Sequence, residues 1–283
     1  DGQTALKSIE DLKKFKEDGA PFFLAVGFVK PHLPFNAPKK YWDLYDPNAI
    51  TLPEHATFPE SAPQNAKHNW GELRSYIDIP KTGPLTEAMA KKLIHGYYAS
   101  VSYVDAQIGV LINSLTELGL RENTVIVLVG DHGWSLSEHG LWVKHSNFEV
   151  ALQVPLIISD SRLSNAAHTN SIAELVDLYP TLCELTAGES PTHLQGSSLV
   201  SALKSPATIF KNSALARWKK GETLIMDQLF YTEWKRNNKV VSKMLYNHKT
   251  DPEETINLAN DPDYLSIVKA LSQQLEQFKT TFN

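Results

Sequence analysis

Three short, uninterrupted apolar runs most constrain what this chain can fold into. They are PFFLAVGF at residues 21–28, TVIVLV at 124–129 and VPLII at 154–158. Runs of this length, without a polar residue at every second position, are typical of strands buried on both faces. Strands of that kind occur in parallel sheets covered by helices. The sequence therefore predicts an α/β fold with a largely parallel sheet flanked by helices.

Helical periodicity separates these runs along the chain. Thr86 is a suitable N-cap for a helix in which apolar residues recur every three or four positions, and Gly119 is a natural stop. A second amphipathic segment, 172–187, predicts another helix, interrupted near Pro180. Residues 30–84 contain many prolines and few periodic stretches, and we expect a long irregular region there. Irregular regions of that length in compact proteins are usually functional.

The pattern of predicted elements changes near residue 190, and we predict a domain boundary there. Residues 1–190 carry the apolar runs and the long helix, whereas 191–283 predict a small α+β subdomain with short antiparallel strands and a terminal helix. The predicted elements of this subdomain are two strands, a polar turn between them and a final helix: 229–234, 243–246, Asn237–Asn238 and 264–278.

Composition excludes several classes of protein. Hydrophobic residues make up 42% of the 283, enough for a large core, and the net charge of −5 does not suit a nucleic-acid-binding protein. No apolar run reaches the roughly 18 residues of a membrane span. The single cysteine, Cys183, excludes an intrachain disulfide. An anionic substrate would have to be attracted by local positive charge.

The segment with the most side chains suited to catalysis or metal binding is GDHGWSLSEHGLWVKHSN, residues 130–147. It directly follows the second apolar run. Ligands of α/β proteins bind beyond the carboxyl ends of strands, which is where Asp131 and His132 stand. A carboxylate beside an imidazole can contribute to a divalent metal site, and Gly130 and Gly133 would give the backbone freedom to turn both side chains toward it. The same residues, taken alone, also fit a turn or a helix cap.

Taken whole, this segment resembles the metal- and sulfate-binding segment of the formylglycine-dependent sulfatases, most closely that of the iduronate-2-sulfatase branch. Several separate motifs in one order are more specific than any single motif. The residues that carry the resemblance are Trp134, Glu138, His139-Gly140, Trp142 and Lys144, with NFE (147–149) and VPL (154–156), and the stretches PFFLAVGFVKPHLPF (21–35), YYASVSYVDAQIG (97–109), DLYPTLCEL (177–185), YTEW (231–234) and LYNHKTDPEETINLA (245–259).

The resemblance implies an alkaline-phosphatase-like fold, in which residues 1–190 are the C-terminal half of the catalytic domain. It implies that Asp131 and His132 are ligands of a Ca²⁺ ion. It also implies that Lys144 contacts the sulfate or the bridging oxygen, where a fixed ammonium group offsets developing negative charge. The alternatives for these three side chains are a structural turn and a solvated surface lysine.

Three further side chains receive roles from the same resemblance. His32 would be the general acid near the leaving oxygen, held by a loop that Pro31 and Pro34 stiffen. A buried structural histidine is its alternative. Trp134 and His145 would line the sugar side of the pocket, although core packing suits Trp134 equally well.

Two elements that the family requires have no match in this chain. The nucleophile is a cysteine within Cys-x-Pro/Ala-x-Arg, whereas Cys183 precedes Glu-Leu-Thr-Ala, and there is no Asp-Asp pair for the remaining metal ligands. Because the chain also opens Asp1-Gly2, we expect an N-terminal segment of the same precursor to supply both. We expect the isolated chain to be inactive.

The sequence thus predicts a sulfuric ester hydrolase that releases sulfate from a sulfated sugar of a polysaccharide or glycosaminoglycan. One alternative is a phosphate or phosphonate ester hydrolase of the alkaline-phosphatase superfamily, and another is a non-catalytic fragment that pairs with another chain. We expect no nucleic-acid partner and no membrane span. Because no Asn-x-Ser/Thr site is present, we expect a periplasmic or secreted bacterial protein rather than a lysosomal one.

Overall fold

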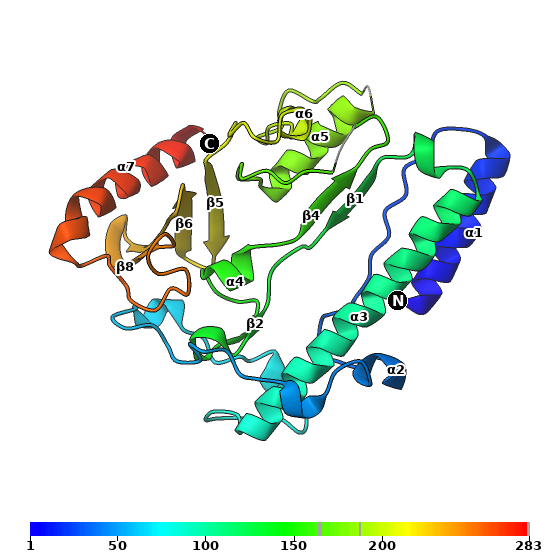
Figure 1. Cartoon of the computed structure of the whole chain (residues 1–283). Helices are drawn as coiled ribbons and strands as arrows, with labels where there is room; N and C mark the ends of the chain where they lie inside the picture. The colour runs from blue at the N-terminus through cyan, green and yellow to red at the C-terminus, as the bar shows by residue number, and fades with distance from the viewer. Residues whose placement is uncertain (164–165, 187, 282–283) are drawn as a thin grey trace. The chain divides into compact units, whose positions relative to one another are not determined.

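The computed structural model describes residues 1–163, 166–186 and 188–281, and the chain forms two compact units (Figure 1). The first unit comprises Asp1–Pro53, Glu72–Ile126 and Ile158–Arg162, and the second comprises Glu54–Gly71, Val127–Ile157 and Leu163–Asn283. Among the described residues, no helix is both long and apolar enough to cross a membrane. Short 3-10 turns connect the longer elements: η1 (Pro47–Ala49), η2 (Gln64–Ala66), η3 (Leu73–Ser75), η4 (Arg121–Asn123), η5 (Glu138–Gly140), η6 (Leu175–Asp177) and η7 (Pro262–Tyr264).

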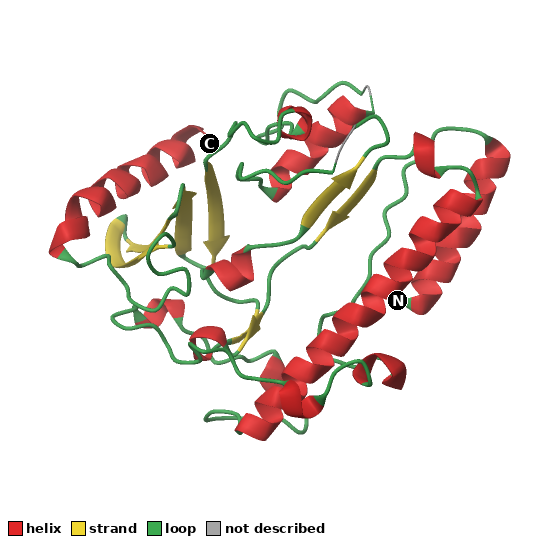
Figure 2. Ribbon diagram, in the orientation of Figure 1, coloured by secondary structure: helices red, strands yellow, loops and turns green. Residues whose placement is uncertain are grey.

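The first unit is built around two long helices, α1 (Gly2–Asp18) and α3 (Glu87–Glu117), which lie side by side, with the short α2 (Lys39–Trp42) against α3 (Figure 2). The predicted start of α3 is confirmed, because Thr86 Oγ1 accepts a hydrogen bond from Met89 N at 3.3 Å. Gly119, with φ +68°, follows its end. Only Ala5, Ser8 and Leu12 of α1 are buried, and this helix was not predicted from the sequence.

The prediction of a buried strand at residues 21–28 is wrong. Within the described residues, this segment pairs with no strand, and the Phe23 side chain is 79% exposed. Its neighbour Phe22 instead stacks on Phe15 of α1, with ring centroids 4.9 Å apart. An apolar run gives a segment β-propensity, but a strand also needs a hydrogen-bonded neighbour.

The other two apolar runs do form strands. β1 (Ile126–Val129) and β4 (Leu156–Ser159) are neighbours in a two-stranded sheet. The prediction that they are buried on both faces is wrong for the described residues, because Val129 is 41% and Ile157 58% exposed. With a single hydrogen-bonded neighbour each, these strands have open edges and only partial cover.

A helix within 172–187 is also confirmed, although residue 187 lies outside the described residues. The interruption falls at the junction between η6 and α5 (Leu178–Leu185), which places Pro180 in the first turn of α5, where its missing N–H is tolerated. Cys183 on α5 is a half-buried free thiol. The short α6 (Val200–Lys204) follows.

The second unit contains a four-stranded antiparallel sheet, β5–β6–β7–β8. The two predicted strands and the Asn237–Asn238 turn are confirmed, and both turn residues have positive φ, 51° and 58°. The predicted final helix is also confirmed, whereas the first two strands of the sheet were not predicted. The bounds are β5 (Ser213–Trp218), β6 (Gly221–Met226), β7 (Leu229–Arg236), β8 (Lys239–Asn247) and α7 (Leu265–Thr281).

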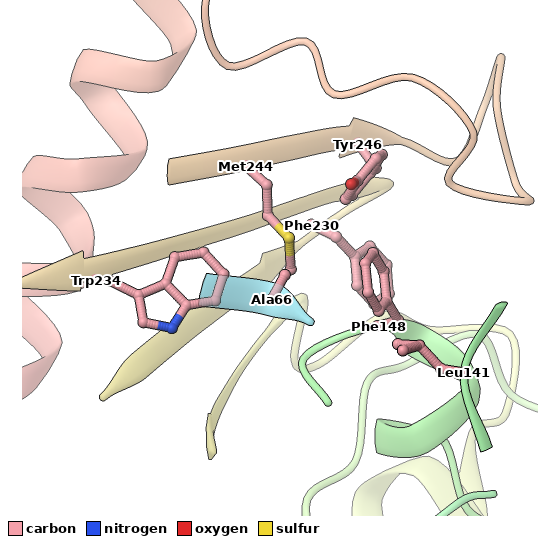
Figure 3. Packing of buried hydrophobic residues seen from close by; sticks show 7 residues of the cluster. All are labelled: Ala66, Leu141, Phe148, Phe230, Trp234, Met244 and Tyr246. Atoms are coloured by element: carbon pink, nitrogen blue, oxygen red, sulfur yellow. The ribbon is translucent and has the colours of Figure 1, made fainter. Parts of the chain in front are cut away.

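The two faces of this sheet have different neighbours. One face, with Leu224, Tyr231 and Leu245, packs against α7. The opposite face packs against the segment that carries the chemical motif, as Figure 3 shows for Leu141 and Phe148. The residues of this second cluster are Ala66, Leu141, Phe148, Phe230, Trp234, Met244 and Tyr246.

We predict that Phe148→Ala lowers the free energy of unfolding by about 3–5 kcal/mol, because it leaves a cavity beneath the motif segment. Phe148 is fully buried, and its ring contacts those of Phe58, His139 and Tyr246. Urea unfolding of the protein measures the change. Phe23→Ala, at a position that is 79% exposed, is the matched control and should change the stability by less than about 0.5 kcal/mol. Equal effects of the two substitutions would contradict the packing described here.

Candidate active site

The motif segment begins where β1 ends, as the sequence predicts. Gly130 N donates to Pro155 O at 3.1 Å, which ties the end of β1 to the residue before β4. The Asp131 side chain is 89% exposed, and its Oδ2 lies 3.6 Å from His132 Nε2. The two neighbouring side chains therefore approach each other beyond the strand end.

The hydrogen bond of His132 determines which ring nitrogen could bind a metal. His132 Nδ1 lies 2.8 Å from Gly133 O and donates to it, which leaves Nε2 as the nitrogen that could bind a metal. Nε2 is also the nitrogen near Asp131 Oδ2. Asp131 Oδ2 and His132 Nε2 would together contribute to holding a divalent cation, whose positive charge would offset that of an anionic ligand.

Gly133 has a different role from the one that the sequence analysis assigned. Neither Gly130 nor Gly133 has positive φ, so backbone freedom to turn is not what requires glycine there. A Cβ on Gly133 would lie 2.2 Å from Val150 O, and Gly133 N donates to Ala151 O at 3.0 Å. Glycine is required because the backbone of α4 (Glu149–Leu152) approaches too closely for any side chain.

Three of the predicted site residues are in contact with one another. The Trp134 ring, 8% exposed, stacks near that of His132 with centroids 5.9 Å apart. Lys144 Nζ lies 5.3 Å from the centroid of the Trp134 ring. A cation over an aromatic face is attracted to it, so Trp134 orients the ammonium group of Lys144. Trp134 thus lies between the two polar side chains.

The backbone that presents Lys144 is strained. β2 (Ser135–Leu136) and β3 (Trp142–Val143) form a short antiparallel hairpin. Ser137, His139 and Val143 have positive φ, at 96°, 55° and 68°. For β-branched Val143 this conformation costs about 1–3 kcal/mol and persists only where the surroundings impose it.

Side chains far along the sequence hold this segment in place. Asn147 Nδ2 donates to Gly221 O at 3.2 Å and to Thr223 Oγ1 at 3.0 Å, both on β6. The C-terminal sheet thus supports the segment with hydrogen bonds as well as apolar packing. No local pattern in the sequence signals these partners.

A buried polar network adds a second support. Glu254, 2% exposed, lies 3.4 Å from His139 Nε2 and 3.2 Å from His248 Nε2, and it accepts from Glu149 N at 3.1 Å. Burial raises the pKa of Glu149. Burial lowers the pKa of His248, but its hydrogen bond to Glu254 and the nearby carboxylates outweigh this, so the pKa is raised. The sequence feature that points to Glu254 is its position in LYNHKTDPEETINLA, one of the stretches that carry the family resemblance.

His145 lies in an aromatic cluster. Its ring centroid is 6.2 Å from that of His68 and 6.3 Å from that of Trp218. Burial, together with the charges of His145 and Lys219, lowers the pKa of His68 to about 4, so His68 is neutral at physiological pH. Neither His68 nor Trp218 belongs to a local motif, so neither was predicted from the sequence.

His32 belongs to the first unit, where its ring has two oxygen partners. Its Nδ1 lies 2.9 Å from Leu33 O, and its Nε2 lies 2.9 Å from Glu72 Oε1. Glu72 was not predicted from sequence. The role of His32 as the general acid near the leaving oxygen stays a prediction.

The described residues fit a partial metal site. Nowhere in residues 1–163, 166–186 and 188–281 do three or more His, Cys, Asp or Glu side chains form a group that could hold a metal ion. Asp131 and His132 offer two ligand atoms, whereas Ca²⁺ takes about six to eight. The chemistry of the pair suits a divalent cation, but further ligands would be needed.

Comparison with known sequences assigns the chain to a family. The sulfatase profile matches residues 3–189, and the profile of the C-terminal part of N-sulphoglucosamine sulphohydrolase matches residues 137–281. Iduronate 2-sulfatase of Mus musculus is 37% identical over 216 residues, which are 65% of this chain and 39% of the mouse protein. A sulfatase of Formosa agariphila is 30% identical over 279 residues, 96% of this chain and 52% of that protein. The chain thus spans about half, or less, of the length of these relatives.

Solved structures show the fold. The structure of BT4656 in complex with its substrate D-glucosamine-2-N,6-O-disulfate matches with a TM-score of 0.84 at 20% identity, covering 99% of this chain and 69% of that one. Phosphonate monoester hydrolase SpPMH from Silicibacter pomeroyi matches with a TM-score of 0.83 at 22% identity, covering 99% and 59%. The predicted α/β, alkaline-phosphatase-like fold is thereby confirmed. Since the sulfatase profile matches more than half of the residues, the chain belongs to the sulfatase family, and it is similar to iduronate 2-sulfatase.

Proposed function

We propose that this chain is the metal- and sulfate-binding part of a sulfuric ester hydrolase that acts on a sulfated sugar of a polysaccharide or glycosaminoglycan. The observation that carries the proposal is the cluster at the end of β1. There, Asp131 and His132 approach within 3.6 Å, and Trp134 lies between His132 and Lys144. Family membership supports the reaction, and the names of the relatives support a sugar substrate.

In this proposal Asp131 and His132 are ligands of Ca²⁺, which would neutralise charge on the sulfate and on a formylglycine nucleophile. Lys144 contacts the sulfate, and Trp134 and His145 face the sugar. His32 gives a proton to the leaving oxygen. The remaining Ca²⁺ ligands and the nucleophile come from an N-terminal segment of the same precursor. The limited share of the relatives that this chain spans is compatible with that arrangement.

Two further features are part of the proposal. The domain boundary lies at 190/191, with the catalytic α/β domain before it and the small subdomain after it. The protein is periplasmic or secreted and bacterial rather than lysosomal. Bacterial relatives such as the Formosa agariphila sulfatase support the bacterial origin.

The test compares the product of the complete gene with this chain alone on sulfated disaccharides, a phosphate monoester and a phosphonate monoester. We expect the complete product to prefer a sulfate ester by at least about 100-fold in kcat/KM, a difference of about 2.7 kcal/mol in transition-state binding. The isolated chain should release no sulfate, and calorimetry should detect no tight Ca²⁺ binding to its two ligands. Preference for a phosphonate would establish the superfamily alternative, and no turnover of any ester would establish a non-catalytic role.

A further inference from the structure

We propose that Glu72 is a positioning residue for His32, a role that rests on the proposed sulfatase function. Glu72 Oε1 lies 2.9 Å from His32 Nε2, while His32 Nδ1 lies 2.9 Å from Leu33 O. Both ring nitrogens therefore face oxygen atoms. Because a carboxylate and a backbone carbonyl can only accept hydrogen bonds, the two contacts together select the ring form that carries a proton on each nitrogen. A general acid must be in that form before it acts.

The backbone at both His32 and Glu72 is held in place by neighbouring contacts. Leu33 and Leu73, which follow His32 and Glu72, are 5% and 1% exposed and anchor the two segments in the core. His32 N donates to Val29 O at 2.9 Å. Glu72 O accepts from Ser75 N at 3.3 Å and from Ser75 Oγ at 2.7 Å, which begins the η3 turn. The contact between the two side chains is thus set by the fold of the first unit.

The pair also determines which nitrogen gives up its proton. Nδ1 is directed at the backbone carbonyl of Leu33, whereas Nε2 is directed at the side chain of Glu72. The His32 side chain is 32% exposed and that of Glu72 is 25% exposed. When the S–O bond breaks, its electron pair stays on the sugar oxygen, and the Nε2 proton leaves its hydrogen bond to Glu72 and transfers to that oxygen. The ring is then neutral and regains a proton from water. Glu72 then accepts the hydrogen bond of the restored N–H.

The experiment exploits the fact that a poor leaving group needs the acid and a good one does not. In the complete gene product, Glu72→Gln should lower kcat/KM for a sugar sulfate by about 10- to 100-fold, because glutamine can donate to an unprotonated Nε2. Hydrolysis of 4-nitrophenyl sulfate should change by less than about 3-fold, since its phenolate leaves without protonation. Glu72→Asp keeps the charge and should recover part of the loss. In a His32→Ala background, Glu72→Gln should have no further effect.

An equal loss on both substrates, or no loss on the sugar sulfate, would overturn the positioning role. A readout that needs no catalysis keeps this separate from the sulfatase proposal. In ¹⁵N-histidine-labelled protein, the His32 Nε2 signal should move toward that of an unprotonated nitrogen in Glu72→Gln. Unchanged ring signals would also overturn the proposal. If the wild type hydrolyses no sulfate ester while the ring signals do move, the proposed function fails, but the contact between Glu72 and His32 stands.

Discussion

Replacement of Asp131 by asparagine in the complete gene product is expected to lower kcat/KM for sugar-sulfate hydrolysis by about 1000-fold or more, or about 4 kcal/mol of transition-state stabilisation. An asparagine side chain would keep the shape of the aspartate but lose the negative charge that strengthens the binding of a hard divalent cation. Since the Asp131 side chain is 89% exposed, the fold should tolerate the change. Steady-state kinetics, a Ca²⁺ titration of activity and a thermal melt measure the three quantities.

Asp18→Asn is the matched control for this prediction. Asp18 is an exposed residue at the end of α1, outside the motif segment, and it loses the same charge on substitution. We expect it to leave kcat/KM and the melting temperature unchanged. If Asp131→Asn retained more than a tenth of the activity, Asp131 would not be a metal ligand. If it unfolded the protein, its role would be structural.

The second large effect is expected for His32→Ala, which removes the proposed general acid. General acid catalysis contributes about 10²- to 10⁴-fold, so kcat/KM for a sugar sulfate should fall by that range. The loss should be much smaller for 4-nitrophenyl sulfate, because an aryl leaving group departs without a proton. The two substrates, measured side by side over a range of pH, distinguish loss of the acid from general damage to the site.

His95→Ala is the control for His32→Ala, since it removes another imidazole of the same unit. His95 Nε2 bonds to Trp42 O at 2.9 Å, and its ring packs against that of Trp42, so its contacts are structural. We expect His95→Ala to affect both substrates alike, through stability. A uniform loss for His32→Ala, similar for the sugar and the aryl ester, would refute the general-acid role.

The chemical motif was readable from sequence because its residues are close in the chain. Asp131 and His132 follow a strand, and Lys144 stands 12 positions after His132, so local turns bring them toward one another. The contacts that the supporting residues make could not be predicted from the sequence. Glu254 is 105 positions from Glu149, and Glu72 is 40 positions from His32, and no periodicity or spacing links such pairs. Contacts between distant segments depend on how the whole chain packs, which a local pattern does not record.

The same division applies to the fold. Helix α3 and the β7–β8 hairpin were predictable, because a capping threonine, a stop glycine and an Asn-Asn turn act through their own backbone neighbours. Residues 21–28 have an equally strong apolar pattern, yet they form no strand, and β5 and β6 form without such a pattern. The sequence by itself thus determined the elements whose stabilising hydrogen bonds are local. Only the tertiary structure decided which extended segments became strands, because a strand exists only where another segment supplies the partners for its backbone.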